Sequence, residues 1–499
     1  MKAFSRRIIL ISTALVIITG CASGPDFRIP ETGMPAQYPT SSMSVNPEKI
    51  PSEIRTEQHV IMDRDIPGEW WTLFRSPELD KMIKQALADS PTLTAAQAAL
   101  RKAEENLRAV KGSVLYPAVD ADLQAKRQKT SGNANAGASD TYNLYNTSVS
   151  VSYTLDIFGG GRRQMEAYQA QVDYQRYQYE ATYLTLIANI VTTAIKEASF
   201  REQLTAKKEI INIQQKQLDI IKRQFELGAV AKADVLSQEA EVAATKAELP
   251  DIEKQLDLTL HALSVLVGRF PGSSDLPDFK LESLHLPQEL PVSLPSSLAH
   301  QRPDIRASEA LLHQACAEVG VATANLYPQI TLNAGYGFQA IGTNILFNGE
   351  SAIWNLGAGL LQPVFRGGEL TAKRRAALAA YDQAQAQYKQ TILEAFQDVA
   401  DVLRALEADA KTLKTQTEAE NIAKSALELI EKQYELGAVG YPALLISQRD
   451  YEKAKVNVIA AKAQQYADTS ALFQALGGGW WNRKSSSLNT DYGQGVDKQ

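Results

Sequence analysis

Two stretches of the chain carry long helical patterns without a glycine or proline, Arg162–Leu227 and Glu369–Leu436. At a rise of 1.5 Å per residue, each stretch of about 66 residues predicts one helix on the order of 100 Å long. Both end in nearly the same hexapeptide, Phe225-Glu-Leu-Gly-Ala-Val230 in the first and Tyr434-Glu-Leu-Gly-Ala-Val439 in the second. A duplicated rod of this length is typical of a device that spans a distance.

A hydrophobic stripe with sevenfold spacing follows the far half of each rod. Its positions are Leu204, Ile211, Leu218 and Phe225 in the first rod and Leu413, Glu420, Leu427 and Tyr434 in the second. Sevenfold spacing is typical of helices that pack lengthwise on other helices. One charged residue, Glu420, interrupts the stripe. The rods are therefore expected to pack along their length on other helices.

Alternation with a period of two predicts four strands of roughly ten residues. Two of them cover Ile330–Phe338 and Trp354–Leu360, one covers Val149–Leu155, and one follows Pro117. This length and pattern fit membrane β-strands, and they fit a soluble pair of hairpins packed on helices equally well. Four strands cannot close a barrel, and lipid does not tolerate an open sheet edge. A membrane location would therefore require several chains to share one barrel.

The predicted elements recur in two halves, each in the order helix, hairpin, long helix, turn, helix. Tyr116-Pro117 ends the first helix of one half, and Tyr327-Pro328 ends its counterpart. The predicted domains are a signal peptide at 1–20, a lipidated tether at 21–68, repeat 1 at 69–268, a linker or equatorial segment at 269–297, repeat 2 at 298–477 and a C-terminal tail at 478–499.

Composition and charge narrow the function classes. The chain has 499 residues, 44% hydrophobic residues and a formal net charge of −6, which favours a folded core and gives no reason to expect nucleic-acid binding. Of its two cysteines, one lies in the leader, so the mature chain cannot hold a disulfide framework. The other, Cys316, is expected to be a small buried hydrophobic residue.

The N-terminal leader has the pattern of a secretory signal. Basic residues at Lys2, Arg6 and Arg7 precede an apolar run, Ile8–Ile18, that is too short to cross a bilayer. The leader ends in Ile18-Thr-Gly-Cys21, which resembles a bacterial lipobox and predicts lipidation of Cys21. Ala22 then favours the outer membrane. The alternative is an ordinary secretory signal with a chance cysteine.

Residues with catalytic or metal-binding chemistry do not gather in the sequence. The five histidines have neither metal-ligand nor nucleophile–base spacing. Gly159-Gly-Gly-Arg-Arg163 lacks the lysine of a phosphate loop, and its counterpart Arg366-Gly-Gly-Glu369 indicates a structural turn. Asp398 and Asp401, three apart on one helix face, are expected to be solvated or to face a lumen. The sequence predicts neither an enzyme nor a cofactor or metal site.

Several motifs together resemble one family. They are Trp70-Trp-Thr-Leu-Phe74, Leu298-Ala-His-Gln-Arg-Pro-Asp-Ile-Arg306, Tyr327-Pro-Gln-Ile and the two Glu-Leu-Gly turns. The chain resembles the outer-membrane efflux factors, the TolC-type channels of the NodT/OprM-like lipoprotein branch, over about residues 24–480. The resemblance implies a mainly α fold with membrane β structure: a homotrimer with a twelve-helix coiled-coil barrel across the periplasm and a twelve-stranded β-barrel in the outer membrane.

The resemblance also implies roles for the two hexapeptide turns and the residues near them. Such channels open and close at this periplasmic tip, where the turn residues Gly228, Ala229, Val230, Gly437, Ala438 and Val439 would dock an adaptor protein. A tyrosine before the second turn can bond to an aspartate near the first. Tyr434 and Asp234 hold the matching positions. Tyr434 is expected equally well as the aromatic end of the stripe, and Asp234 as a solvated carboxylate.

The chain departs from the family pattern at the constriction. Where many members carry an acidic ring, the run Leu444-Leu-Ile-Ser-Gln-Arg449 has Ile446, and an arginine found in some members is replaced by Val439. A charge-selective, salt-bridged gate is therefore not expected. The hypothesis is a hydrophobic constriction of Pro442, Leu445 and Ile446 that closes by dewetting.

The sequence thus favours a passive efflux duct for small molecules such as drugs, toxic compounds or metal ions. Its expected partners, implied by the resemblance, are a periplasmic adaptor and an inner-membrane pump of the RND type. Its expected location is the bacterial outer membrane, through a lipid anchor and a long periplasmic extension. The alternatives are the duct of a protein secretion system and a non-conducting, lipid-anchored coiled-coil protein.

Overall fold

A computed structural model describes residues 22–30, 58–62, 64–131, 141–272, 276–292 and 295–483. Cys21 and the predicted signal peptide lie outside these residues, as do most of the tether and the end of the tail. The described chain folds into two compact units. Unit 1 contains residues 22–30, 98–176 and 307–390, and unit 2 contains the rest.

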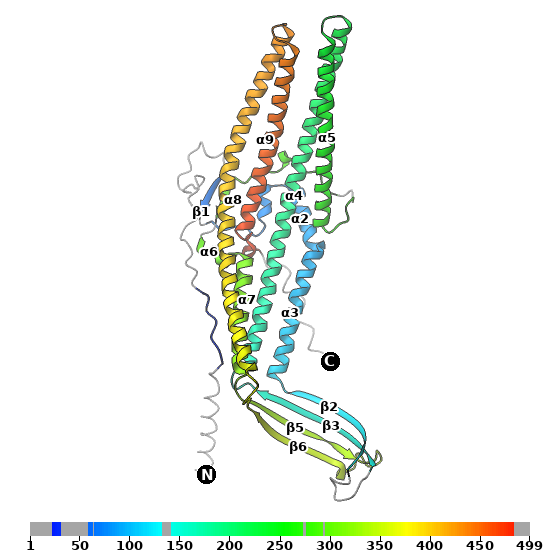
Figure 1. The fold of residues 1–499 in the computed structure, drawn as a ribbon, viewed down its shortest axis with the longest axis vertical. Helices are drawn as coiled ribbons and strands as arrows, with labels where there is room; N and C mark the ends of the chain where they lie inside the picture. The colour runs from blue at the N-terminus through cyan, green and yellow to red at the C-terminus, as the bar shows by residue number, and fades with distance from the viewer. Residues whose placement is uncertain are drawn as a thin grey trace. The chain divides into compact units, whose positions relative to one another are not determined.

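Unit 2 is mainly helical and holds most of the two rods (Figure 1). The rods are α4, Gly160–Glu226, and α8, Glu369–Glu435, each a single helix of 67 residues, which confirms both predicted helices. The helices that follow them are α5, Lys232–Leu266, and α9, Tyr441–Ala475. Shorter helices are α2, Pro77–Asp89, and α6, Pro295–Gln301, and the 3₁₀ turns are η3, Trp70–Phe74, η4, Leu281–Ser283, and η6, Trp480–Asn482.

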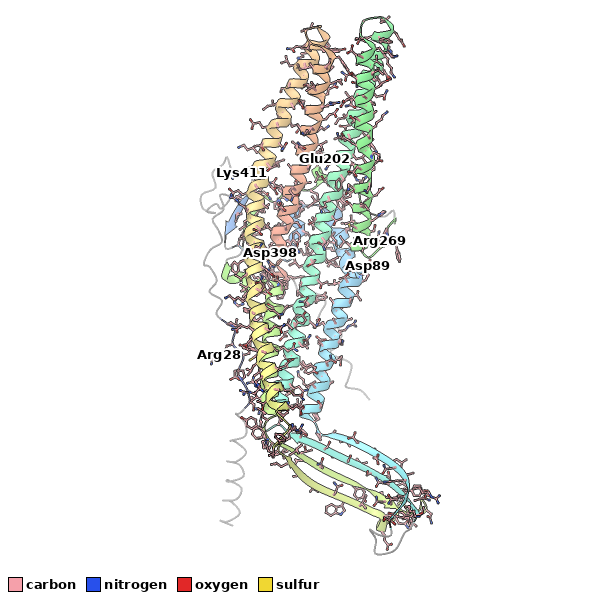
Figure 2. All side chains as sticks on the ribbon, in the orientation of Figure 1. Arg28, Asp89, Glu202, Arg269, Asp398 and Lys411 are labelled. Carbon is pink, nitrogen blue, oxygen red and sulfur yellow. The ribbon has the colours of Figure 1, made fainter. Side chains whose placement is uncertain are left out.

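The core of unit 2 forms around the Trp70–Phe74 motif. Trp70 and Phe74 are fully buried, and the Trp70 ring stacks on Phe473 of α9 with centroids 5.1 Å apart. Aromatic side chains bury the largest apolar area per residue, so this motif anchors α9 to the segment before α2. By contrast, Figure 2 places the charged residues Asp398 and Lys411 along α8. Asp398 is half exposed and accepts a hydrogen bond from Arg302, 2.9 Å away.

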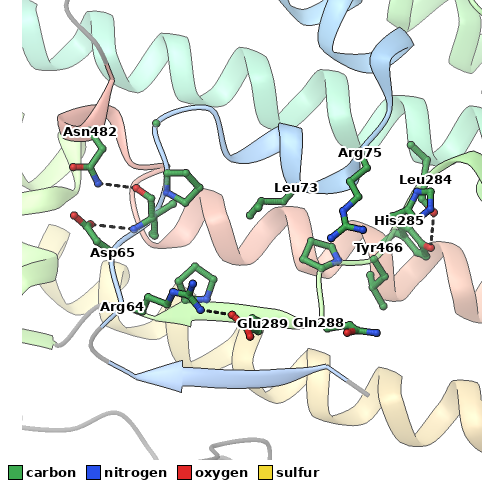
Figure 3. Close-up of a pocket in the computed structure, with 16 residues that line it drawn as sticks. Arg64, Asp65, Leu73, Arg75, Leu284, His285, Gln288, Glu289, Tyr466 and Asn482 are labelled. Carbon is green, nitrogen blue, oxygen red and sulfur yellow. Dashed lines mark hydrogen bonds and ion pairs between the residues drawn. The ribbon is translucent and has the colours of Figure 1, made fainter. Parts of the chain in front are cut away.

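A short parallel pair of strands in unit 2 takes one strand from the predicted linker and one from the predicted tether. Strand β1, His59–Met62, pairs with β4, Glu289–Val292. A groove of ≈ 980 Å³ lies beside this pair, between residues 64–68, 284–291 and the end of α9 (Figure 3). An ion pair between Arg64 and Glu289 crosses it, and Asn482 donates to the Ile66 carbonyl.

Unit 1 contains a four-stranded antiparallel sheet with the order β2-β3-β5-β6. Its strands are β2, Ala118–Lys129, β3, Thr141–Leu155, β5, Gln329–Ala340, and β6, Ala352–Leu361. The three predicted strand segments lie inside β3, β5 and β6, and β2 follows Pro117 as expected. Helices α3, Pro91–Leu115, and α7, Pro303–Ala324, precede the two hairpins.

The strand register sorts the side chains onto two chemically different faces. Val151 pairs with both Val119 and Ala334, and Val149 with both Ala121 and Tyr336. Because side chains alternate across a strand, these pairs place one apolar face over all four strands. Its larger members are exposed: Val119, Leu123, Val149, Leu332, Tyr336, Trp354, Leu356 and Leu360. The other face carries mainly glycine and polar residues, with Leu144, Ile353 and Leu361 among them.

Glycines on the polar face allow the strands to approach closely. A Cβ added at Gly337 would lie 2.3 Å from the Thr147 carbonyl oxygen and 2.7 Å from the Ser148 Cα. Gly337→Val is therefore expected to push β5 from β3 and to destabilise the protein by about 1–3 kcal/mol. Thermal unfolding followed by circular dichroism would measure the loss. Gly357→Val, in open space on β6, is the matched control. Equal unfolding temperatures for the two variants would contradict the close packing.

The start of α4 is a capped turn. Gly159 has a φ of 75°, and the Asp156 carboxylate accepts hydrogen bonds from the backbone N–H groups of Gly161 and Arg162, both at 2.9 Å. A carboxylate at this position satisfies the free N–H groups of a helix start. The sequence-based interpretation of this glycine run as a structural turn is confirmed.

Among the described residues, no helix is sufficiently long and apolar to cross a membrane.

Candidate functional site at the helical tip

The two hexapeptides form the same turn at the ends of α4 and α8. In the first, the N–H of Gly228 donates to the Phe225 carbonyl at 2.9 Å and that of Ala229 to the Gln224 carbonyl at 2.8 Å. In the second, Gly437 donates to Tyr434 at 3.0 Å and Ala438 to Gln433 at 2.8 Å. This is the Schellman pattern, which requires a left-handed residue after the helix. The glycines supply it, with φ of 78° and 73°.

We call residues 214–245 and 427–452 the tip. Gly228, Ala229, Gly437 and Ala438 are exposed there, whereas Val230 and Val439 are half-buried. The leucine before each turn glycine, Leu227 or Leu436, is 84% exposed. Each turn therefore presents a small apolar surface to solvent.

A hydrophobic core joins all four helices of the tip. Its buried members are Leu218 and Ile221 of α4, Val235 and Val242 of α5, and Tyr441, Leu444 and Leu445 of α9. Leu427, Ile430 and Tyr434 of α8 pack against them. The predicted stripe positions Leu218, Leu427 and Tyr434 thus pack between helices, as expected.

The core corrects one part of the predicted constriction. Leu445 is 9% exposed and packs among the four helices, so its side chain cannot line a channel. The sequence could not show which of Leu445 and Ile446 faces the core. Adjacent helical residues point about 100° apart, and the sequence does not give the direction of the neighbouring helices. Pro442 and Ile446 are exposed, the latter at 60%.

The predicted partners Tyr434 and Asp234 each make a different contact. The Asp234 carboxylate accepts a hydrogen bond from the Ala231 N–H at 3.1 Å, which caps α5. The Tyr434 ring lies against the Tyr441 ring, with centroids 5.6 Å apart. Among the described residues, no hydrogen bond joins Tyr434 to Asp234. Burial, and then the negative charge of Asp234, raise the pKa of Tyr434.

Tyr441 makes a link across the tip that the sequence analysis missed. Its hydroxyl donates to the side-chain oxygen of Gln238 on α5, and the Gln238 amide donates to the Gln214 carbonyl of α4 at 2.9 Å. Tyr441 and Gln238 are both buried, and burial raises the pKa of Tyr441, so the hydroxyl keeps its proton. The hydrogen bonds tie α9 to α5 and α4.

An ion pair that the sequence analysis did not predict also crosses the tip, between α9 and α5. The Arg449 Nε lies 2.8 Å and 2.7 Å from the two carboxylate oxygens of Glu241 on α5. The Glu241 side chain is 6% exposed and the Arg449 side chain 61% exposed. Bidentate pairing fixes the carboxylate in one orientation. The only signal in the sequence was Arg449 itself, in the run where Ile446 replaces an acidic residue.

Glu452 is buried next to this pair and is a weaker acid than an ordinary glutamate. Its Oε1 accepts from the Gln214 side chain at 2.9 Å. Burial raises the pKa of Glu452 to about 7, Lys207 counteracts the shift, and Glu241 adds to it. Because the folded-state pKa lies above the unfolded value near 4.3, the folded state holds this proton more tightly. The resulting stabilisation is full below about pH 4 and is lost as the pH rises through 7.

Glu452→Gln should therefore reduce the pH dependence of the protein's stability. We expect the variant to gain about 1 kcal/mol over wild type between pH 5 and 8, after allowance for solvent screening. Thermal unfolding of both proteins across that range would measure the gap. Glu239→Gln on the exposed side of α5 is the control. A gap that stays constant with pH would contradict the assignment.

In the described ranges, the tip included, no three His, Cys, Asp or Glu side chains lie close enough together to hold a metal ion. Cys316 is 2% exposed, as predicted for a small buried hydrophobic residue. What the tip geometry can do is mechanical. Hydrogen bonds and an ion pair hold two helical hairpins together around an apolar core. Breaking these interactions would let the hairpins move.

Comparisons with known proteins agree with this geometry. The profile of the outer membrane efflux protein family matches residues 82–269 and 294–478. The pyoverdine export outer membrane protein OpmQ of Pseudomonas putida is 31% identical over 82% of this chain and 88% of its own. The probable outer membrane lipoprotein SilC of Salmonella typhimurium is 25% identical over 96% of this chain and 99% of its own.

The fold has solved counterparts. The outer-membrane channel OprN superposes with a TM-score of 0.83 and 25% identity, covering 92% of this chain and all of OprN. The rods, the four-stranded sheet and the family match agree, and the chain belongs to the outer membrane efflux protein family.

Proposed function

We propose that three copies of this chain form a passive duct through which an efflux system exports small molecules. The protein is the outer-membrane channel component of such a system, and members of its family are channels, not enzymes. The duct would have no catalysis of its own, and its energy would come from an inner-membrane pump. The proposal extends to the trimer, the membrane barrel, the lipid anchor and the gate residues.

The four-stranded sheet is the observation from which we infer the trimeric barrel. One face is apolar and exposed, which fits contact with lipid, and the other is lined mainly by glycine and polar residues, which fits a water-filled lumen. In the described residues β2 and β6 each pair on one side only. Open edges are not tolerated in lipid, so closure requires further strands. Three chains would supply the twelve strands.

The internal duplication would let each chain provide two equivalent sets of helices and strands. Two separate family matches and the matching tip turns support this repeat, with repeat 1 at 69–268 and repeat 2 at 298–477. The rods from three chains would form a twelve-helix tunnel through the periplasm.

The partners we propose are a periplasmic adaptor and an RND-type pump. The exposed turns, with Leu227 and Leu436 beside Gly228 and Gly437, offer apolar surfaces for the adaptor. Pro442 and Ile446 would form the constriction, and Arg449, Glu241, Tyr441 and Gln238 would hold it closed.

Export of small molecules is favoured over protein secretion. The relative OpmQ is named for the export of pyoverdine, and the toluene efflux pump protein TtgF of Pseudomonas putida is 28% identical over 96% of this chain. Loss of resistance to toxic compounds on gene deletion would support small-molecule efflux. Loss of a secreted protein instead would favour the secretion duct.

Lipidation of Cys21 would add a second membrane attachment, because one acyl anchor alone binds only marginally. We expect radiolabelled palmitate to be incorporated into the wild-type protein and to be lost completely in Cys21→Ser. Localisation of both proteins in membrane fractions is the accompanying measurement. Equal labelling of the variant would remove the anchor from the proposal.

The experiment that tests the duct is single-channel conductance of the purified protein in a planar bilayer, with its oligomeric mass measured beside it. A trimer with discrete, long-lived conductance steps is the expected result. A monomer, or a trimer that never conducts, would overturn the duct and favour a lipid-anchored structural rod.

A further inference from the structure

The positive charge of the four-stranded sheet gathers at one end of strand β2. Lys126, Arg127 and Lys129 are the basic residues within the bounds of β2, β3, β5 and β6, and all three are exposed. Because β2 begins directly after α3, these residues lie at the end of the sheet away from α3 (Figure 1). We call this end of the sheet the distal end.

The strand register places the three basic side chains on different faces. Neighbouring residues of a strand point to opposite faces. Arg127 and Lys129 belong to the same alternating set as Val119, which pairs with Val151, so they lie on the apolar face. Lys126 belongs to the other set and lies on the polar face. The apolar face of β2 therefore ends in two cations.

These two cations have no acidic neighbour on the apolar face of the strands. The acidic residues of the strands, Asp120 and Asp122, both lie on the polar face. The residues opposite Arg127 and Lys129 on β3 are uncharged. Neither side chain forms an ion pair with any residue that the structure describes. A partner for this charge must therefore come from outside the described chain.

Aromatic side chains lie just before the two cations. Tyr145, Tyr336, Phe338 and Trp354 are all on the apolar face, in neighbouring cross-strand rows near the distal end. Such residues are enriched where a membrane protein passes from hydrocarbon to lipid headgroups. Tyr145 is in the outermost of these rows, two residues before the row of Arg127.

Spacing along the strands gives the depth of the cations. On β3 the apolar face from Leu155 to Tyr145 covers a rise of roughly 34 Å along the strand. A tilt of about 45° reduces this to about 24 Å, close to the height of the apolar band of a membrane barrel. By the same arithmetic Arg127 and Lys129 lie about 5 and 10 Å beyond the band, which is the depth of the headgroups.

We propose that Arg127 and Lys129 bind the phosphate groups of an anionic lipid in the membrane leaflet at the distal end. A guanidinium group pairs with phosphate oxygens in a bidentate manner, and the lysine adds a second positive charge. Lys126 does not take part, because it points into the lumen. The inference rests on the proposed membrane barrel and adds to it a lipid class and the two residues that recognise it.

The probe for this site is lipid A, a glycolipid with two phosphates, titrated onto the purified full-length protein in a neutral detergent. Native mass spectrometry counts the bound lipid. Arg127→Gln combined with Lys129→Gln should weaken binding roughly 30-fold, and each single substitution about fivefold. The matched control is Lys126→Gln, which removes the same charge from the polar face of the same strand. It should keep the wild-type affinity and change the ion selectivity of the channel instead.

A second comparison does not depend on the folding of any variant. Wild-type protein should bind lipid A from which both phosphates have been removed roughly 30-fold more weakly. Equal affinity for the two lipids, or an equal loss of binding in Lys126→Gln, would overturn the inference. Displacement of lipid A by inorganic phosphate at equal concentration would also overturn it, because the site would then bind free phosphate. These outcomes leave the duct intact, whereas a wild-type protein that never conducts would overturn the proposed function itself.

Discussion

Arg449→Ala is expected to open the tip. The substitution leaves the Glu241 carboxylate buried without its cationic partner, and all three hydrogen bonds from Arg449 are lost, including the two from Nε at 2.8 and 2.7 Å. Breaking a buried pair at one partner costs more than the pair contributes, because the remaining charge stays desolvated. With Arg449 partly exposed we expect a loss of about 2 kcal/mol, or a roughly 30-fold shift toward open tips.

The measurement is single-channel open probability together with hydrogen exchange at residues 433–442. Lys222→Ala is a matched control, because Lys222 of α4 pairs with Glu239 of α5 at 2.8 Å with both side chains exposed. Exposed pairs contribute at most about 1 kcal/mol. Adding Glu241→Gln to Arg449→Ala should restore part of the closure. Equal effects of Arg449→Ala and Lys222→Ala would mean that the buried pair does not hold the tip.

Ile446→Asp is expected to raise cation conductance through closed channels by several-fold. Ile446 is exposed on α9, away from the four-helix core, so in the proposed trimer three copies would surround the axis. A narrow apolar ring excludes water, and a ring of carboxylates would hydrate it and attract cations. Conductance and reversal potential in a salt gradient would measure both effects.

Two further variants separate the effect of charge on conductance from the effects of polarity and of unfolding. Ile446→Asn should raise conductance without cation selectivity, since it adds polarity but no charge. Leu445→Asp should unfold the tip instead, because it would place a charge inside the core of α4, α5, α8 and α9. If Ile446→Asp leaves closed-state conductance unchanged, the dewetting hypothesis fails.

Local sequence signals were sufficient for the two long helices and for the four-stranded sheet, but not for strand β1 in the predicted tether. The absence of glycine and proline predicted α4 and α8 almost to the residue, and glycines at 228 and 437 predicted where they end. Period-two alternation predicted β3, β5 and β6. These features depend on backbone propensity and side-chain direction within a few residues, which the order of amino acids determines directly.

Local sequence patterns did not predict the side-chain contacts at the tip. The sequence identified this end of the molecule, and it placed Tyr434 beside an aromatic stripe. The resemblance offered a bond between Tyr434 and Asp234 and left open that Tyr434 ends the stripe and that Asp234 is solvated. In the structure the Tyr434 ring lies against Tyr441, and Asp234 caps α5. The sequence analysis also assigned Leu445 to a constriction, although Leu445 is part of the core.

The sequence by itself determined the rods, the turns, the alternating strands and the family. Only the tertiary structure decided which tip residues meet. Tyr441 and Gln238 are 203 residues apart in the chain, and Arg449 and Glu241 are 208 apart. Such pairs form because long helices pack in one rotation about their axes, and that rotation is set by the whole interhelical core. No pattern within a single helix contains this information.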